Sequence, residues 1–126
     1  MKAGLMLCVA ALGVLAVAIP AGAAAPAKGP AKSACSLSQD EQNGALGASY
    51  VYSLKARNLS CDRAKKLVKK FHECRHANGG RDGHCGSVEG YSCEQKKLDS
   101  SPNLLQAKAK CEKGSKLFKQ TFGESI

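Results

Sequence analysis

Three histidines lie close together around a glycine-rich segment: His72, His76 and His84. Two histidines and a lysine can act as acid, base and charge stabiliser, which is the chemistry of a secreted ribonuclease. The spacing places no second acidic or basic partner beside them, and Ser87 and Ser92 lie in no nucleophile-elbow motif. We therefore expect a protein without catalytic residues and without a cofactor.

The same segment has the residue types of a zinc site. Cys74, His76, His84 and Cys85 could offer two sulfurs and two nitrogens to the metal. Their spacing fits no familiar zinc finger, and cysteines of exported chains meet an oxidising compartment. The sequence therefore predicts a disulfide beside two solvent-exposed histidines, and no metal site.

The cysteines outside the first 23 residues number six: Cys35, Cys61, Cys74, Cys85, Cys93 and Cys111. Six cysteines in a short exported chain predict three disulfides. A helix would hold Cys61 and Cys74 about 20 Å apart, too far to bond. Cys74–Cys85 is the favoured pair, because glycines let residues 75–84 turn back, and closing this loop contributes about 2.5–3 kcal/mol. The pairing of Cys35, Cys61, Cys93 and Cys111 stays open.

The chain has 19 lysines and arginines against 10 aspartates and glutamates, which gives a formal net charge of +9. One set falls on the exposed side of a predicted helix: Lys65, Lys66, Lys69 and Lys70. A second set falls on a predicted hairpin: Lys108, Lys110, Lys113, Lys116 and Lys119. Such a surface attracts polyanions, among them anionic lipid, teichoic-type polymers, polysaccharide and nucleic acid. The alternative is that the lysines only keep the protein soluble.

The sequence also bears on partners other than a general polyanion. Specific nucleic-acid recognition is not expected, because aromatic residues are few and no reader motif is present. Membrane lysis is not expected either, because the apolar side of the helix is needed for the core. A module that binds a secreted protein, such as an enzyme inhibitor, is the alternative, since the disulfide-closed loop 75–84 would be pre-organised. The oligomeric state is not indicated.

The first 23 residues predict a cleaved secretory signal peptide. A lysine precedes an uncharged apolar run at 5–19, and Ala21-Gly22-Ala23 forms a small-x-small cleavage site. Cleavage after Ala25 is disfavoured because Pro26 would follow it. The run is shorter than the roughly 20 residues that span a bilayer, which argues against an uncleaved anchor. The mature protein, with a charge of about +8, is expected to be secreted.

Two further segments follow the signal peptide. Residues 24–34 are rich in Ala, Pro, Gly and Lys, a composition that predicts a disordered linker. Residues 35–126 are expected to form a single disulfide-bonded domain.

Periodicity predicts one helix, over residues 60–75. Ser60 is a good N-cap, and Asp62 suits the first turn. One stripe at helical spacing is apolar: Cys61, Ala64, Leu67, Val68, Phe71 and Cys74. This stripe is expected to pack on the domain.

Alternation predicts four strands. In residues 50–57 one side would hold Tyr50, Tyr52, Leu54 and Ala56. A second strand covers 88–95, a loop follows at 98–103, and 105–111 with 116–122 form a β-hairpin. The order strand, helix and three strands indicates an α+β domain, with the helix laid across a small antiparallel sheet.

Three segments in this order resemble a group of small exported bacterial proteins that is common in actinobacteria. They are 59–64 (LSCDRA), 88–93 (VEGYSC) and 109–114 (AKCEKG), and the pattern covers most of residues 48–122. The resemblance implies a secreted α+β domain in which Cys61, Cys93 and Cys111 are structural. It implies no catalytic or binding residue.

Overall fold

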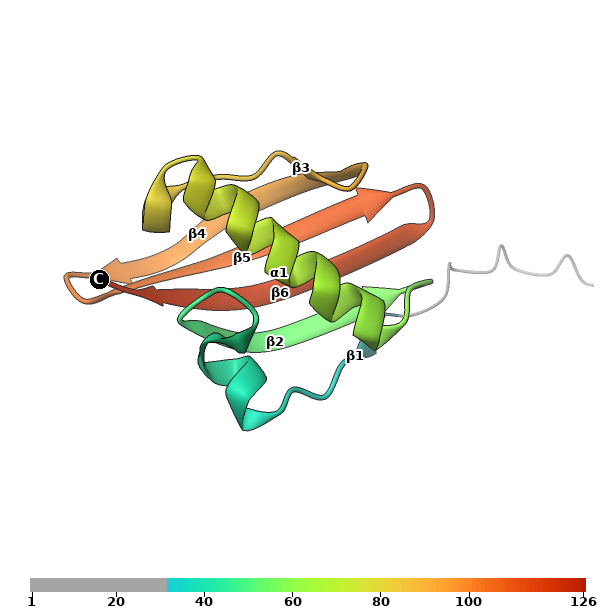
Figure 1. Ribbon diagram of the computed structural model, residues 1–126, viewed down its shortest axis with the longest axis horizontal. Coiled ribbons are helices and arrows are strands. Elements are labelled where there is room, and N and C mark those ends of the chain that lie inside the picture. Colours follow the sequence, from blue (N-terminus) through green and yellow to red (C-terminus); the bar gives the residue numbers. More distant parts are fainter. Residues whose placement is uncertain (1–31) are drawn as a thin grey trace, which may run out of the picture.

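The computed structural model describes residues 32–126, and Figure 1 shows one helix lying across a six-stranded antiparallel sheet. The elements are β1 (Ser33–Ala34), the helical turn η1 (Glu41–Ala45), β2 (Tyr50–Arg57), α1 (Cys61–Ala77), η2 (Gly80–Asp82), β3 (Ser87–Val88), β4 (Tyr91–Ser101), β5 (Leu104–Lys113) and β6 (Lys116–Ser125). The predicted signal peptide and most of the predicted linker lie outside the described residues. The last linker residues, Ser33 and Ala34, pair with β2.

The strands lie in the order β1-β2-β6-β5-β4-β3. The last strand therefore returns to pair with β2, and consecutive hairpins build the rest of the sheet. The described domain is mostly sheet and fits the predicted α+β class only loosely. Its order is also two strands, the helix and four strands, rather than one strand, the helix and three.

A tight turn divides the single strand predicted at 88–95. Glu89 and Gly90 both have positive φ, 46° and 82°, which fits the two-residue turn of a β-hairpin. Val88 consequently pairs with Tyr91. Non-glycine residues seldom adopt positive φ, so the pattern of apolar residues did not predict a turn at Glu89.

The loop predicted at 98–103 is wrong. β4 continues to Ser101, which pairs with Leu104, so only Pro102 and Asn103 form the turn. The register shifts between Lys97 and Asp99, which marks a β-bulge. The serines and Asp99 are typical of turns, but pairing along the whole of β5 keeps this segment extended.

The helix α1 confirms the prediction and ends two residues later. The Ser60 hydroxyl accepts a hydrogen bond from the Arg63 amide at 3.2 Å, as expected of an N-cap. The predicted stripe packs against the sheet, where its largest side chain, Phe71, lies 6.2 Å from Phe122 between ring centroids. Burial of these side chains is the main force that holds α1 on the sheet.

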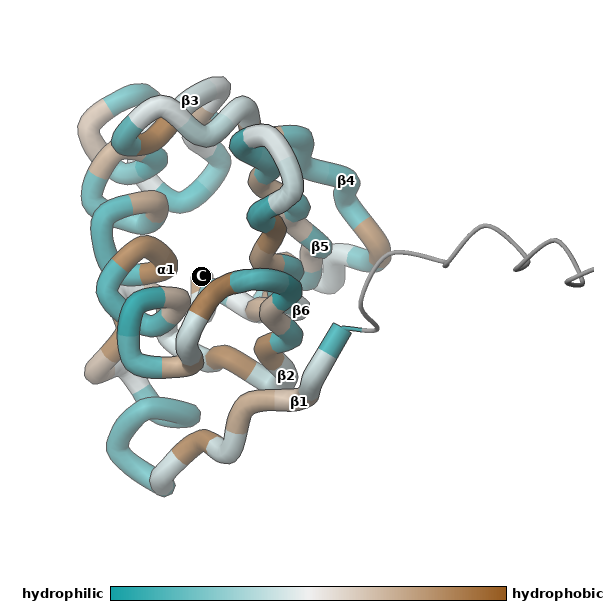
Figure 2. The backbone as a smooth tube through the Cα atoms, turned by 90° about the vertical axis from the view of Figure 1, so that its right-hand side faces the viewer, coloured by the Kyte–Doolittle hydropathy of each residue, from teal (hydrophilic) through white to brown (hydrophobic). Residues whose placement is uncertain are grey.

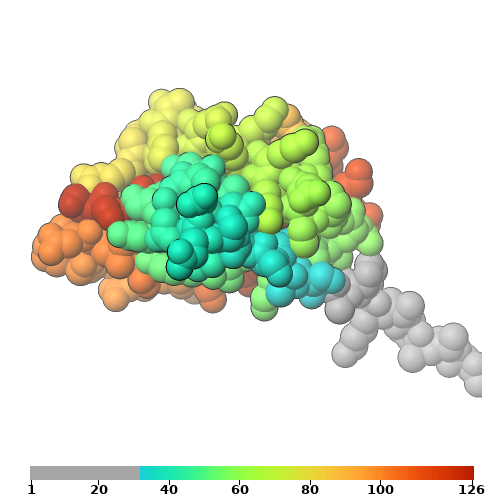
Figure 3. All heavy atoms as spheres, turned by 60° about the horizontal axis from the view of Figure 1, so that its bottom comes forward, coloured from blue at the N-terminus to red at the C-terminus, as the bar shows by residue number. Residues whose placement is uncertain are grey.

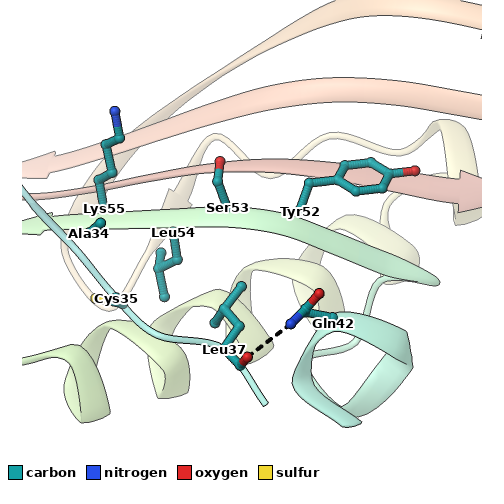
Figure 4. Close-up of a pocket in the computed structure, with 8 residues that line it drawn as sticks. All are labelled: Ala34, Cys35, Leu37, Gln42, Tyr52, Ser53, Leu54 and Lys55. Carbon is teal, nitrogen blue, oxygen red and sulfur yellow. Dashed lines mark hydrogen bonds between the residues drawn. The ribbon is translucent and has the colours of Figure 1, made fainter. Parts of the chain in front are cut away.

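A β-bulge changes which side chains of β2 lie on the same face of the sheet. Tyr50, Tyr52, Leu54 and Ala56 were expected on one side, but Val51 pairs with Phe122 while Ser53 pairs with Thr121. This shift adds one residue to β2 and reverses the alternation. Leu54 is buried while Tyr52 is exposed. Figure 4 shows Leu54 pointing toward the helix layer, and Ser53 and Lys55 pointing away from it.

All six predicted cysteines form disulfides: Cys35–Cys61, Cys74–Cys85 and Cys93–Cys111. The favoured pair is confirmed, and its two sulfurs are therefore not free for zinc. Cys35–Cys61 fastens the N-terminal segment to the start of α1, and Cys93–Cys111 joins β4 to β5. Three disulfides in a short chain are typical of an oxidising, extracellular environment. Within residues 32–126, no helix is long and apolar enough to cross a membrane.

The segment between β1 and β2 covers one flank of the domain. Figure 3 shows it, in cyan to green, on the surface beside α1. Lys65 of α1 lies 3.0 Å from Glu41 of η1, which adds an ion pair to the nearby disulfide. No other element of residues 32–126 lies on the side of the sheet opposite to α1, so that within this part of the chain the sheet has one packed and one open face (Figure 2).

Candidate functional site

The open face of the sheet gathers lysines from neighbouring strands. Lys55 of β2 pairs in register with Lys119 of β6, which pairs with Lys110 of β5. Lys108 pairs with Thr121 one row away. Because alternate residues of a strand point to opposite faces, these lysines lie on the face that α1 does not cover. No described helix lies over them.

A groove of about 340 Å³ lies among three of these lysines, Lys55, Lys108 and Lys119, and is also lined by Lys32, Ser53 and Thr121. We call the four lysines of this groove the lysine cluster. No carboxylate within residues 32–126 forms an ion pair with any of the four. The groove therefore offers four cationic groups and two hydroxyl groups to a ligand.

The lysines of the cluster repel one another. The charge of Lys32 is the largest cause that lowers the pKa of Lys119, followed by desolvation and the charges of Lys108, Lys55 and Lys110. Like charges that lie opposite each other on paired strands destabilise a sheet. A bound anion would relieve this repulsion, which makes the cluster complementary to a dense negative charge.

A second groove, of about 440 Å³, continues the charged surface across β4. It shares Lys108 and Lys119 with the first groove and adds Lys96 and Lys110. Lys110 is partly neutralised, since its Nζ lies 3.3 Å from Glu112 and 4.0 Å from Glu94. The positive charge is therefore densest at the lysine cluster and weaker toward β4.

The lysines predicted on the helix lie on the other side of the molecule, and carboxylates partly neutralise them. Lys65 pairs with Glu41, and Lys70 pairs with Glu89, which also binds Arg63. These ion pairs lower the pKa of Glu89, chiefly through Lys70. The structure thus separates the predicted binding lysines: Lys108 and Lys110 join the open face, whereas those on the helix do not.

The lysines predicted on the hairpin do not all lie at the grooves either. Lys113 reaches back to β3–β4, where its Nζ lies 5.8 Å from the centre of the Tyr91 ring and donates to the Glu89 carbonyl oxygen at 3.4 Å. Lys116 sits beside the turn of the hairpin, paired with Lys113. Of Lys113, Lys116 and Lys119, only Lys119 lines the grooves.

The three histidines occupy different environments and do not form one site. His72 is fully buried between α1 and β6, His76 is partly exposed, and His84 lines a separate cavity of about 370 Å³ with Asp82, Gln95 and other residues. A fully buried imidazole cannot contact a large substrate. The proposed ribonuclease arrangement of His72, His76 and His84 is therefore not assembled in the structure.

The tautomer of His72 follows from its neighbours. The Arg75 guanidinium only donates, so His72 Nδ1 accepts from Arg75 Nε at 3.3 Å. His72 Nε2 then carries the hydrogen and donates to Gln120 Oε1 at 2.8 Å. Burial is the largest cause that lowers the pKa of His72, to about 4, and the charge of Arg75 acts in the same direction. His72 is thus a neutral structural residue at physiological pH.

Arg75 and Glu124 form a buried ion pair that sequence reasoning missed. Glu124 Oε1 accepts from Arg75 and from His76 Nε2, while Oε2 accepts from the Ser49 hydroxyl at 3.0 Å and its amide at 3.3 Å. Burial raises the pKa of Glu124, but these hydrogen bonds and the Arg75 charge outweigh it and lower the pKa overall. The Arg75 guanidinium carbon also lies 4.7 Å from the centre of the Phe122 ring.

This polar network ties three parts of the chain together. Arg75 also donates to the Arg81 carbonyl oxygen, and Arg81 donates to the Ser125 carbonyl oxygen. The end of α1, the loop 75–84 and the end of β6 are thereby held in one arrangement. Ser49 and His76 bind opposite oxygens of Glu124, so the histidine does not activate the serine as a nucleophile.

The sequence indicated only some of the features that form the open face. Lys55 and Lys119 fall on strands that alternation predicted, but their pairing requires the strand order, which the pattern did not contain. Lys32 lay in the predicted linker. The chain matches no protein-family model, and comparison with curated proteins and solved structures finds no similar protein. The resemblance to small exported actinobacterial proteins stays a prediction.

Proposed function

We propose that this protein is a secreted, non-enzymatic binding protein that associates with polyanions through the open face of its sheet. The observation that carries the proposal is the lysine cluster, in which four lysines surround one groove without a described carboxylate partner. Clustered lysines repel one another and lower the stability of the sheet. Lysines that only keep the protein soluble could be spread over the surface instead. Binding of an anionic polymer would explain why the lysines are clustered.

The proposal assigns the binding to the sheet and not to the helix. Long-range attraction depends on local charge density, and Glu41 and Glu89 lower that density on the helix side. On the open face, Lys55 and Lys119 lie directly opposite each other. Neighbouring strands are about 4.8 Å apart, so several lysines can contact one polymer at the same time.

The test compares two triple variants of equal net charge, with long-chain inorganic polyphosphate as the ligand. The sheet variant is Lys55→Gln, Lys108→Gln and Lys119→Gln, and the helix variant is Lys66→Gln, Lys69→Gln and Lys70→Gln. We expect the sheet variant to lose at least about tenfold in affinity and to show a salt dependence shallower by about 2. The helix variant is expected to stay within about threefold of the original protein.

Unfolding by urea, without reductant, serves as the control for folding. Removal of opposed like charges is expected to leave the sheet variant as stable as the original protein or slightly more stable. Equal losses of affinity in both variants would show that binding depends on net charge alone. That result would overturn the assignment to the open face.

Secretion after cleavage of a signal peptide is part of this proposal, supported by the three disulfides and the apolar N-terminal run. Anionic polymers of the cell envelope or of the extracellular space are then the ligands that the protein would meet. The alternative is a module that binds a secreted protein through loop 75–84. The contacts of Arg75 and Arg81 that fix this loop favour such a role, because they lower the entropy lost on binding.

A further inference from the structure

Two tyrosines stand beside the lysine cluster on the open face. Tyr50 and Tyr52 have exposed fractions of 36% and 47%, and their rings stack with centroids 6.1 Å apart and an angle of 15° between planes. They reach this face because of the bulge in β2, which separates their side from that of Leu54. The chain has three tyrosines and no tryptophan, and the third, Tyr91, is buried.

Gly123 of β6 leaves room for Tyr52. A Cβ atom at position 123 would lie 2.6 Å from Tyr52 Oη and 3.1 Å from Cε2, so a side chain there would push the Tyr52 ring away from β6. The backbone of Gly123 does not have positive φ, so the close contact with Tyr52, and not the backbone conformation, distinguishes this glycine. The phenol end of Tyr52 therefore lies over Gly123 of β6, the strand that also carries Lys119.

The tyrosines and the lysine cluster form one continuous surface. Ser53 follows Tyr52 and lines the groove, and Thr121 lines it from β6, two residues before Gly123. Two residues of a strand span about 7 Å, so the Tyr52 ring lies within the reach of one nucleotide from the groove. Figure 4 shows Tyr52, Ser53 and Lys55 following one another along β2.

We infer that the polyanion bound by the open face is single-stranded nucleic acid, with phosphates on the lysine cluster and a base stacked on Tyr52. The inference rests on the proposed function and narrows its ligand. A polymer without rings would use the lysines but gain little from two exposed aromatic rings, whereas unpaired bases stack on aromatic side chains whatever their sequence. A duplex keeps its base faces covered. Lysines contact phosphates as point charges and do not read sequence, so the binding is expected to be general.

This inference revises the expectation drawn from the few aromatic residues of the sequence. Their number is small, but the fold brings two of the three tyrosines to the lysine face. Recognition of a particular base sequence is still not expected, because the contacts assigned to the surface are lysines on phosphates and a stacked ring, neither of which reads base edges.

The experiment measures binding of an oligothymidylate, of the matching duplex and of inorganic polyphosphate to the disulfide-bonded protein at one salt concentration. Tyr52→Leu is expected to weaken binding of the single strand about tenfold and to leave polyphosphate binding unchanged. Tyr52→Phe keeps the ring and should restore binding. Because the chain lacks tryptophan, tyrosine emission reports on the site, and the single strand but not polyphosphate should quench it after correction for absorbance.

Each outcome decides one point. Selective loss of single-strand binding in Tyr52→Leu supports the inference. Equal binding of the single strand by Tyr52→Leu and the original protein, or stronger binding of the duplex or of polyphosphate, overturns the inference and leaves the proposed function standing. Failure of the original protein to bind any of the three ligands overturns both. The urea midpoint of Tyr52→Leu, expected to match that of the original protein, separates lost stacking from lost folding.

Discussion

Glu124→Gln is expected to lower the free energy of unfolding by about 3–5 kcal/mol, the cost of leaving one member of a buried ion pair without its partner. Both oxygens of Glu124 accept hydrogen bonds, one from Arg75 and His76 and the other from Ser49. A glutamine amide nitrogen would therefore face a donor in either orientation, and the charge of Arg75 would be left uncompensated. Urea unfolding followed by circular dichroism measures the loss.

Two further variants test the cause. The double variant Arg75→Met, Glu124→Met removes both charges. Its free energy of unfolding should therefore fall by much less than the sum of the losses in the two single variants. Glu89→Gln breaks exposed ion pairs and should leave the urea midpoint nearly unchanged. A loss below about 1 kcal/mol in Glu124→Gln would contradict the structural role given to the buried pair.

Acidification from pH 7.5 to pH 4.5 is expected to remove about 2.5 kcal/mol of stability through His72 alone. The pKa of His72 is lowered from its ordinary 6.5 to about 4, chiefly by burial. Between these two pH values His72 binds a proton in the unfolded chain but stays neutral in the folded protein. The stability is complete above pH 6.5 and is lost as the pH falls toward 4. The groups that face His72 are Arg75 and His76 of α1, and Gln120 and Glu124 of β6.

His72→Gln isolates this effect, because glutamine can donate to Gln120 and accept from Arg75 without titrating. The variant is expected to be less stable at pH 7.5 but to lose about 2.5 kcal/mol less on acidification. The carboxylates with lowered pKa, Glu41, Glu89 and Glu124, lose their contributions only below about pH 4.5, outside this window. An unchanged dependence on pH in His72→Gln would contradict a buried neutral imidazole.

Local signals in the sequence predicted the parts of the fold that depend on neighbouring residues. The stripe of Leu67 and Phe71, the N-cap at Ser60 and the glycines between Cys74 and Cys85 each acted within one element or one loop, and the structure contains the helix and the disulfide that they indicated. The hairpin of 105–111 with 116–122 is also present in the structure as β5 and β6, since its alternation is regular. These features need no knowledge of the strand order.

The sites that sequence reasoning missed depend on distant contacts. One added residue in β2 moved Tyr52 to the face opposite Leu54, and a regular alternation cannot show such a bulge. The lysine cluster joins β2, β5, β6 and the residue before β1, which only the strand order brings together. Arg75 ends the predicted helix, and only its pairing with Glu124, far along the chain, allows its charged side chain to be buried.

The most direct test of the central claim is a titration of the ¹⁵N-labelled, disulfide-bonded protein with polyphosphate, followed by amide chemical shifts. If the open face binds polyanions, the shifts should change at Lys55, Lys108 and Lys119 and at Ser53 and Thr121 between them. Amides of Lys66 and Lys69 on α1 should stay unchanged. Shift changes centred on the helix, or spread evenly over all lysines, would contradict binding at the lysine cluster.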